Sequence, residues 1–385
     1  MTLLTYLVPV VALLAQVAAL PATSSAIHPR APLAGQFAGD IGACPPLPMR
    51  TTVPTSVKDL RPDDFKAVMA IGDSITAAFA AEGMKLNPVE NILENRGISF
   101  TMGGDKGAVT VANMLKRFSP KIVGASTGDR IVSLCSGRLC GIGGYFPQDR
   151  FNAALSGAKV ENLDRELNYL IKTVKEDKTI NYQKDWKFMS ILIGANDMCD
   201  VCDGTNLDGD TYERLIRAAF EKVRINLPNT VINVMTIFKV SEIWPLTKNE
   251  LQCKIKRALG LKALCGCAFV DGDTASGVAK RKVMDDYAAI WNQRLLKVVT
   301  EYRGKYDNFA VILDPAGGNT PLTQFDPSFV SNIDCFHPSE RAHKYMARNL
   351  WNNLFLDSTN KAQKWPKDLD NTIYCPTATD RIQVA

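Results

Sequence analysis

The chain has 385 residues, a formal net charge of +5 and 46% hydrophobic residues, a composition typical of a globular protein with a sizeable core. Its basic residues are interspersed with acidic residues rather than clustered, which argues against nucleic-acid binding. After the N-terminal segment, no apolar run reaches the roughly 20 residues that a membrane span requires, so no transmembrane segment is expected.

The N-terminal segment is apolar and carries no charged side chain before Arg30. This pattern predicts a signal peptide at residues 1–19 and therefore a secreted, extracellular protein. Residues 20–58, rich in Pro, Ala, Ser and Thr, are expected to form an extended arm or a propeptide. One large domain is predicted over residues 59–357, followed by a tail at residues 358–385, and we expect a monomer.

Four short apolar runs have the length and composition of strands that are buried on both faces. They lie at residues 65–71, 186–193, 230–238 and 309–313. Helices are predicted at residues 210–226, where Asp210-x-x-Glu213 resembles a capping box, and at residues 280–302 and 338–356. The alternation predicts a parallel sheet with helices on both sides, which binds ligands at the carboxyl ends of its strands.

Ten cysteines, an even number, are typical of a protein from an oxidising compartment. The close pairs Cys199-x-x-Cys202 and Cys265-x-Cys267 leave a four-thiolate zinc site open as an alternative, although no histidine cluster accompanies them. Disulfides are the favoured prediction, and Cys135–Cys140 is the first local pair expected. Spacing does not determine the other pairings.

A serine, a histidine and an aspartate are placed so that they could form a nucleophilic site. Ser74 follows the first apolar run in Gly72-Asp73-Ser74, where a strand is expected to stop and a helix to begin. A serine needs a histidine to take its proton, and the histidine needs a carboxylate to orient it. Among the three histidines, His28 lies in a Pro/Ala/Ser-rich stretch and His343 on a predicted helix, so His337 is the best candidate for the base. Asp334, three residues before His337, supplies the carboxylate.

A second serine has the pattern of a nucleophile elbow. Ser126 lies in Gly124-Ala-Ser-Thr-Gly128, which fits Gly-x-Ser-x-Gly, whereas Ser74 does not. That motif requires a strong strand before it and a helix after it. Here two apolar residues precede it, and no helical period follows through Gly144, so Ser126 is disfavoured as the nucleophile.

Acyl transfer also requires hydrogen-bond donors for the oxyanion. The backbone N–H of Ser74 is one candidate, and the side-chain amide of Asn196, just past the second predicted strand, is another. A third is the small-residue turn that contains Gly157, because glycine lets a backbone approach a ligand closely.

These residues fall into four blocks that resemble those of the SGNH (GDSL) hydrolases, in the same order. The blocks are Gly72-Asp73-Ser74, Asn152-x-Ala-x-Ser-Gly157-Ala158, Gly194-x-Asn196-Asp197 and Asp334-x-x-His337. The resemblance implies a three-layer α/β/α flavodoxin-like sandwich with a central parallel sheet. It implies Ser74 as nucleophile, His337 as base and Asp334 as the orienting acid, with Ser74, Gly157 and Asn196 forming the oxyanion hole. Asp73, Gly194 and Asp197 are expected to support the site.

A closer likeness is to the animal phospholipase B branch of that family, over about residues 59–356. It rests on the segments Arg96–Asp105, Asn196–Cys202 and Asp334–His343. The likeness implies a serine esterase that hydrolyses acyl esters of phospholipids and lysophospholipids at a membrane or micelle surface. No metal or cofactor is expected. The acidic residues Asp203, Asp208 and Asp210 miss the spacing of a calcium-binding loop, and a solvated helix start is their preferred interpretation.

Two other functions remain open at this stage. One is an esterase for acetylated sugars or small esters, because one fold can carry many substrate specificities. The other is a non-catalytic secreted binding protein on the same scaffold, which the presence of Ser74, Asn196, Asp334 and His337 argues against. Residues 240–275, where three cysteines lie, are the expected place for a substrate-shaping insertion.

Overall fold

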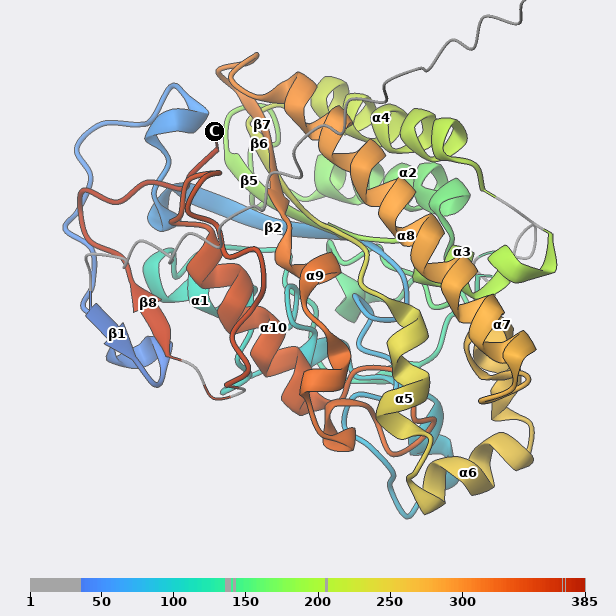
Figure 1. Cartoon of the computed structure of the whole chain (residues 1–385). Helices are drawn as coiled ribbons and strands as arrows, with labels where there is room; N and C mark the ends of the chain where they lie inside the picture. The colour runs from blue at the N-terminus through green and yellow to red at the C-terminus, as the bar shows by residue number, and fades with distance from the viewer. Residues whose placement is uncertain are drawn as a thin grey trace, which may run out of the picture. The chain divides into compact units, whose positions relative to one another are not determined.

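The computed structural model describes residues 36–135, 140, 143–204, 207–368, 370 and 372–384. A parallel sheet with the strand order β2-β5-β6-β7 forms its centre (Figure 1). The four strands are Phe65–Gly72 (β2), Trp186–Leu192 (β5), Thr230–Met235 (β6) and Phe309–Asp314 (β7). One row of paired residues crosses the whole sheet through Ile71, Ile191, Val234 and Leu313. The four predicted strands and their parallel arrangement are confirmed.

The strands form where the sequence is apolar without interruption. Every residue of β5 and β6 is buried, as expected for strands that are covered on both faces. Strand β6 ends at Met235, three residues before the predicted end at residue 238. The N–H of Ile237 donates to Asn292 Oδ1 at 2.7 Å, so a helix side chain replaces the neighbouring strand as its partner.

Helices cover both faces of the sheet (Figure 1). Three of them connect successive strands and pack side by side: α2 (Leu163–Glu176), α4 (Gly209–Asn226) and α8 (Ala275–Tyr302). Because the strand order follows the chain and such crossovers are right-handed, these helices share one face. Helices α1 (Val111–Phe118) and α10 (Glu340–Asn353) cover the other face, where the rings of Phe118 and Trp351 stack with centroids 5.9 Å apart. The predicted three-layer sandwich is confirmed.

The outer edge of β2 is covered by irregular chain. The N–H of Val68 donates to the carbonyl of Val123 at 2.9 Å, and that of Ala70 donates to the carbonyl of Phe151 at 3.0 Å. These bonds extend the sheet beyond β2 without a regular fifth strand. They also bring the segment that leads to Gly157 beside the strand that leads to Ser74.

The helix starts differ from those predicted. Asp208 caps α4 by accepting the N–H of Thr211 at 2.7 Å, so the predicted cap at Asp210 is wrong. Glu213 does not complete a capping box, because its carboxylate instead accepts from Lys297 on α8 at 2.8 Å. The other two predicted helices are observed as α8 and α10, with starts that differ by up to five residues.

Short elements flank this core. They are β1 (Gln36–Ala38), β3 (Leu93–Glu94), β4 (Arg130–Ile131), α3 (Ala195–Asp200), α5 (Ile243–Thr247), α6 (Leu251–Ala258), α7 (Gly266–Phe269), α9 (Ala316–Asn319) and β8 (Ile373–Cys375). Strand β1 pairs with β8, and β3 pairs with β4, both antiparallel. Residues 1–35, which include the predicted signal peptide at 1–19, lie outside the described residues. Within the described ranges, no helix has both the length and the apolar composition of a membrane span.

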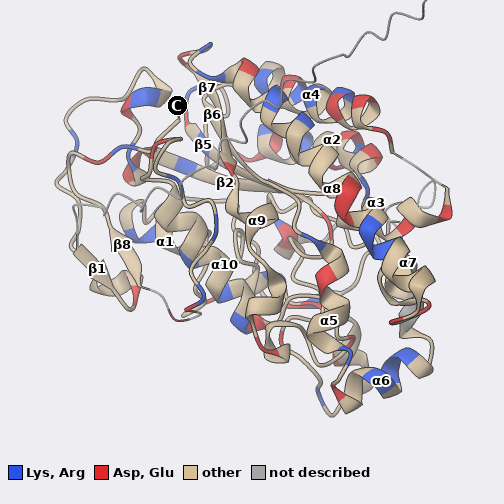
Figure 2. Cartoon of the chain, viewed as in Figure 1, with Lys and Arg blue, Asp and Glu red and all other residues tan. Residues whose placement is uncertain are grey.

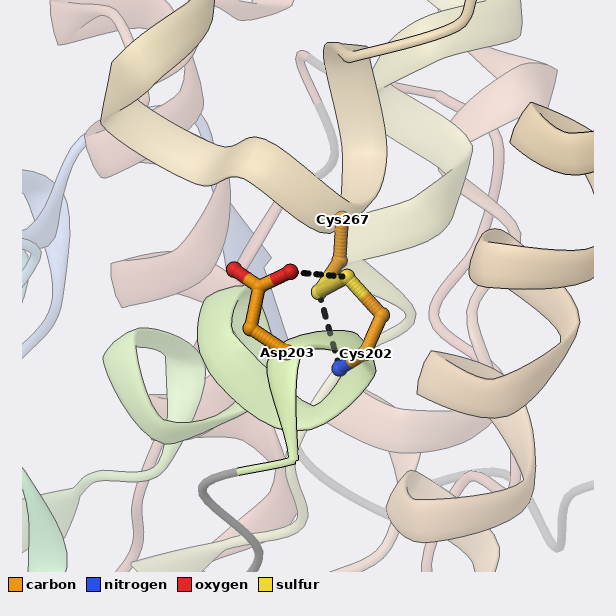
Figure 3. Close-up of side chains that lie close together, drawn as sticks. All are labelled: Cys202, Asp203 and Cys267. Atoms are coloured by element: carbon orange, nitrogen blue, oxygen red, sulfur yellow. Dashed lines mark hydrogen bonds between the residues drawn. A yellow bond between two sulfur atoms is a disulfide. The ribbon is translucent and has the colours of Figure 1, made fainter.

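All ten cysteines are paired. The disulfides are Cys44–Cys375, Cys135–Cys140, Cys199–Cys265, Cys202–Cys267 and Cys253–Cys335. The predicted pair Cys135–Cys140 is confirmed. The zinc alternative is wrong, because the sulfurs of the two close pairs are bonded to each other across the chain. Figure 3 shows this at Cys202 and Cys267, where Asp203 lies beside a disulfide rather than beside free thiolates.

Candidate active site

Ser74 lies just past the carboxyl end of β2, on a tight turn. Gly72 has φ +151°, and a Cβ there would lie 2.4 Å from the carbonyl oxygen of Leu192, so the close approach to β5 requires glycine. The expected helix after Ser74 does not form. Ala78 and Ala80 have φ near +57° and +59°, left-handed values that end the turn before it can continue as a helix.

Ser74, His337 and Asp334 form a continuous line of hydrogen bonds. His337 Nε2 lies 2.7 Å from Ser74 Oγ, and His337 Nδ1 lies 2.5 Å from Asp334 Oδ2. The serine and the histidine are 263 residues apart in the chain, so the fold alone brings them together. All three side chains are buried, and the His337 ring makes T-shaped contacts with the rings of Phe79 and Phe336. This is the geometry of a serine activated by an oriented imidazole.

Asp334 is held in its ionised form by its neighbours. Burial raises the pKa of this carboxyl, but the His337 ring and the N–H groups of Phe336 and His337 outweigh burial and lower it below the usual value. Those N–H groups donate to Asp334 Oδ1 at 2.9 and 3.1 Å. Asp334 Oδ2 therefore remains available for the imidazole, whose orientation it determines.

The three expected oxyanion donors belong to segments that meet around Ser74. Gly157 has φ +86°, and a Cβ there would lie 2.4 Å from the carbonyl oxygen of Cys135, so no side chain fits. Asn196 is the second residue of α3, which follows Gly194, and its Nδ2 donates to the carbonyl of Ala158 at 3.0 Å. An amide Nδ2 carries two hydrogens, so the second can serve a ligand. Within the described chain, the N–H groups of Ser74 and Gly157 donate to no other group.

The two aspartates expected to support the site lie in buried positions. Asp73 Oδ1 accepts the N–H of Ile75 at 2.9 Å, and burial raises the pKa of Asp73 to about 6. Asp197 Oδ2 accepts the N–H of Val160 at 3.1 Å, which joins α3 to the chain that follows Gly157. Burial raises the pKa of Asp197 to about 7.

Glu166 on α2 is a residue that the sequence analysis did not identify. Its fully buried carboxyl accepts the N–H of Gly72 at 2.8 Å and that of Leu155 at 3.2 Å. These residues lie two positions before Ser74 and Gly157, so one side chain joins the turn that carries Ser74 to the segment that carries Gly157. Burial raises the pKa of Glu166 well above its usual range. A signal existed in the sequence, because this glutamate interrupts the apolar face of the α2 helix.

A buried ionic cluster supports the same segment from the other side. Arg96 donates to the carbonyl oxygens of Asn152 at 2.8 Å and of Ala154. Glu94 accepts the hydroxyl of Ser156 at 2.7 Å, next to Gly157. The charges are balanced, because Glu94 pairs with Arg96 at 2.8 Å and with Arg130 at 2.9 Å, and both arginines also contact Asp149. Such a cluster holds a backbone in one conformation, because breaking one of its pairs leaves a buried charge.

The other serine, the other described histidine and two of the acidic residues considered for calcium make structural contacts. Ser126 is fully buried, and its hydroxyl donates to the carbonyl of Arg96 at 2.9 Å, which agrees with its being disfavoured. His343 Nδ1 accepts the N–H of Phe100 at 3.1 Å, and burial lowers the pKa of this histidine to about 3. His28 lies outside the described residues. Among the acidic residues considered for calcium, Asp208 caps α4 and Asp210 pairs with Arg294 at 2.8 Å.

Comparisons with known proteins identify a matching family and distant relatives. The family model described as GDSL-like lipase/acylhydrolase matches residues 68–350. The membrane-associated phospholipase B1 of Rattus norvegicus is 29% identical over 348 residues, which cover 87% of this chain and 23% of that protein. The human protein of the same name is 27% identical over 344 residues, which cover 86% of this chain and 22% of that protein. The chain thus spans less than a quarter of the length of these relatives.

Solved structures with similar folds include a GDSL-like lipase from Parabacteroides merdae, with a TM-score of 0.40 and 19% identity over 76% of this chain and 96% of that one. A phospholipase A1 from Streptomyces albidoflavus has a TM-score of 0.32 and 12% identity over 72% of this chain and 94% of that one. Likeness at this level supports no statement about substrate.

Replacing Glu166 by Leu is expected to lower kcat for ester hydrolysis by about 10- to 100-fold with little change in KM. The N–H of Gly72 loses the Glu166 acceptor, the N–H of Leu155 keeps only its bond to the carbonyl of Gly72 at 3.1 Å, and the two turns shift. Glu166→Gln keeps one acceptor oxygen and should retain more of the activity. The exposed Glu176→Gln on the same helix is the control. If Glu166→Leu loses stability in urea unfolding but keeps the wild-type kcat, the positioning role is wrong.

Replacing Asp197 by Asn is expected to change how stability depends on pH. A buried carboxyl with a raised pKa stabilises the fold fully below its unfolded pKa of about 3.9, and this contribution is lost as pH rises through the folded pKa of about 7. The loss approaches about 1.4 kcal/mol per pH unit in that window. Urea unfolding at pH 4 and pH 8 should therefore show that the free energy of unfolding of Asp197→Asn rises relative to that of the wild type as pH rises. If the difference in free energy of unfolding between the two proteins is the same at both pH values, this prediction is wrong.

Proposed function

The chain belongs to the family of GDSL-like lipases and acylhydrolases, and from this membership and the site geometry we propose that it is a serine esterase of phospholipase B type. Its proposed substrates are the acyl esters of phospholipids and lysophospholipids. The observation that carries the proposal is the line of hydrogen bonds from Asp334 through His337 to Ser74, at 2.5 and 2.7 Å. In the proposed roles, Ser74 is the nucleophile, His337 the base and Asp334 the acid that orients it.

The proposed reaction has two steps. Ser74 Oγ attacks the ester carbonyl carbon while His337 Nε2 takes the hydroxyl proton, and the N–H groups of Ser74 and Gly157 and the amide of Asn196 hold the resulting oxyanion. The tetrahedral intermediate collapses as His337 returns the proton to the leaving alcohol, which leaves an acyl-serine. Water then attacks the acyl carbon, His337 accepts its proton, and the acid is released as Ser74 regains a proton. Groups of the chain carry each of these steps.

One observation supports a lipid acyl group as substrate. The curated relatives, 27–29% identical over most of this chain, are phospholipases B1.

We also propose that the protein is secreted. Five disulfides are consistent with an oxidising, extracellular compartment. The apolar segment at residues 1–19 supports export. The monomeric state and the independence from metals and cofactors stay predictions.

A fluorophosphonate probe is expected to form an adduct on Ser74, as measured by mass spectrometry of the peptide that contains it. Ser74→Ala should abolish the adduct and His337→Ala should slow it, and both should lower hydrolysis of a soluble ester by about 10⁴- to 10⁶-fold. Ser126→Ala, which removes the other serine considered, should label like the wild type. An adduct that persists in Ser74→Ala would contradict the assignment.

Phosphatidylcholine is expected to be converted to free fatty acid, lysophosphatidylcholine and then glycerophosphocholine, as followed by mass spectrometry of the lipid extract. Ser74→Ala should form none of these products. Hydrolysis of acetylated sugars or short soluble esters without release of fatty acid from phospholipid would retain the serine esterase and reject the phospholipase B assignment.

A further inference from the structure

Helix α6 exposes apolar side chains and buries an arginine, which is the reverse of an ordinary surface helix. Its buried residues include Cys253 and Arg257, while Leu251 is 72% exposed and Ile255 is 52% exposed. Leu259, directly after the helix, is 80% exposed, so the three apolar residues follow at intervals of four along one face. Surface helices normally turn their apolar stripe towards the core. Here the arginine lies inside and the leucines face outwards.

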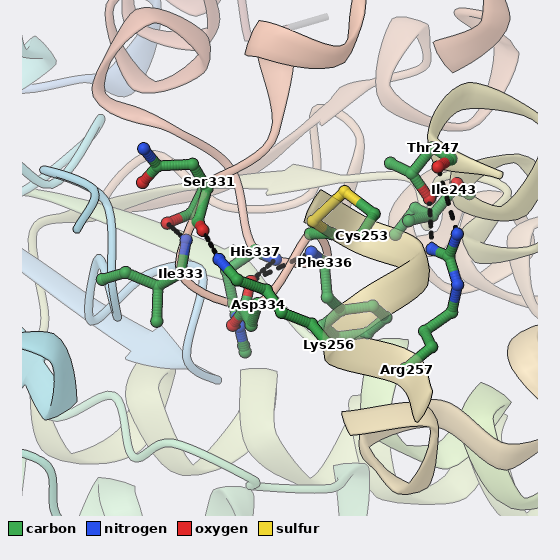
Figure 4. Close-up of a disulfide and its surroundings, with 12 residues drawn as sticks. Ile243, Thr247, Cys253, Lys256, Arg257, Ser331, Ile333, Asp334, Phe336 and His337 are labelled. Carbon is green, nitrogen blue, oxygen red and sulfur yellow. Dashed lines mark hydrogen bonds and ion pairs between the residues drawn. A yellow bond between two sulfur atoms is a disulfide. The ribbon is translucent and has the colours of Figure 1, made fainter. Parts of the chain in front are cut away.

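The inverted orientation is imposed by anchors on the inner face. Cys253 is bonded to Cys335, and the guanidinium of Arg257 donates to the hydroxyl and the carbonyl of Thr247 at 3.0 and 3.1 Å (Figure 4). Arg257 also lies over the ring of Trp244, 5.0 Å from its centroid. Since Cys335 is two residues before His337, the exposed apolar stripe is held next to the catalytic loop.

A second exposed apolar segment meets α6 at the same place. Residues 84–92 expose four large hydrophobic side chains, Met84, Leu86, Val89 and Ile92, of which Leu86 is fully exposed. The N–H of Met84 donates to Asn332 Oδ1 at 2.7 Å, and Lys256 on α6 donates to the carbonyl of Asn332. Both segments are thus joined at a residue two positions before Asp334.

Two further exposed apolar side chains, Ile131 and Leu134, extend this surface towards Gly157. Ile131 on β4 is 55% exposed and pairs with Leu93 on β3. Leu93 directly follows Ile92, so Ile131 lies beside the exposed segment at residues 84–92. Leu134 is 52% exposed and lies in register with Ser156, the neighbour of Gly157. We call the nine exposed residues the apolar rim: Met84, Leu86, Val89, Ile92, Ile131, Leu134, Leu251, Ile255 and Leu259. Scattered exposed leucines are normal on protein surfaces, but a group gathered around a site marks an interaction surface.

The charge of α6 indicates which partner fits. Within Leu251–Ala258 the helix carries the exposed Lys254, the partly exposed Lys256 and no acidic residue, while its third cation, Arg257, is buried (Figure 2). Apolar side chains that project beside lysines are typical of helices that lie in a lipid–water interface, where the apolar groups enter the acyl region and the cations meet anionic headgroups.

We propose that the apolar rim docks the enzyme on an anionic phospholipid surface. This inference rests on the proposed function, since a surface that meets lipid next to the triad serves an enzyme whose substrate lies in that surface. Docking would bring ester groups to Ser74 from the bilayer or micelle itself, without a substrate molecule first leaving into water. The rim is therefore expected to matter for aggregated lipid and not for a soluble ester.

The test is sedimentation with phosphatidylcholine vesicles that contain phosphatidylglycerol, using full-length Ser74→Ala protein so that the vesicles stay intact. The triple change Leu251→Ser, Ile255→Ser and Leu259→Ser should weaken vesicle binding by about 10- to 100-fold, because about three apolar side chains lose their burial in lipid. The matched control is Ile225→Ser, Ile290→Ser and Leu296→Ser, three comparably exposed residues on α4 and α8. It should bind vesicles like its parent, and vesicles without phosphatidylglycerol should bind less protein.

In the active protein, the rim variant should lose hydrolysis of vesicle phospholipid and keep hydrolysis of a soluble short-chain ester. Vesicle binding by the rim variant equal to that of the control would overturn the inference. So would a wild-type protein that hydrolyses soluble esters but binds no vesicles. If the rim change instead converts a dimer to a monomer in sedimentation velocity, the rim is a contact between copies of this chain and the lipid assignment is wrong. Rim-dependent vesicle binding without phospholipid hydrolysis would support docking and reject the proposed function.

Discussion

The hydrogen bond between His337 and Ser74 is the contact on which the rest of the site depends. It joins two turns at the carboxyl end of the sheet, and a small displacement of either turn would break it, because hydrogen bonds weaken steeply with distance and angle. The turn with Ser74 is constrained by the close approach of Gly72 to β5. The turn with His337 is constrained by two N–H bonds to Asp334 and by the disulfide at Cys335.

Buried carboxyl groups serve the same purpose around the segment that contains Gly157. Glu166 accepts backbone N–H groups from the segments of Ser74 and Gly157, and Glu94 accepts the hydroxyl of Ser156. Burying carboxyl groups costs free energy, which the bonds from N–H groups and arginines offset. The result is specific geometry rather than extra stability, because these groups are satisfied in one arrangement of the chain. Oxyanion donors are effective when they are held in place before the reaction begins.

The loop that carries Asp334 and His337 is joined covalently and by hydrogen bonds to the apolar rim. The bond between Cys253 and Cys335 and the contacts of Asn332 with Met84 and Lys256 join α6 and residues 84–92 to the segment that carries Asp334 and His337. Residues 240–275 are expected from the sequence to be an insertion that shapes substrate access. Three disulfides hold them, one to Cys335 beside His337, one to Cys199 in α3 and one to Cys202 just after α3. A surface attached in this way keeps a constant position relative to the nucleophile.

Sequence pattern alone predicted the four strands of the sheet and brought forward the candidate nucleophile and base. Uninterrupted apolar runs specify buried strands, and with three histidines in the chain, elimination alone points to His337 as the base. The tertiary structure alone decided the helix cap at Asp208, the end of β6 at Met235, four of the five disulfides, and the roles of Glu166 and α6. Each of these depends on contacts between residues far apart in the chain. Local pattern indicates which side chains favour burial, but it does not indicate which distant backbone group they will meet.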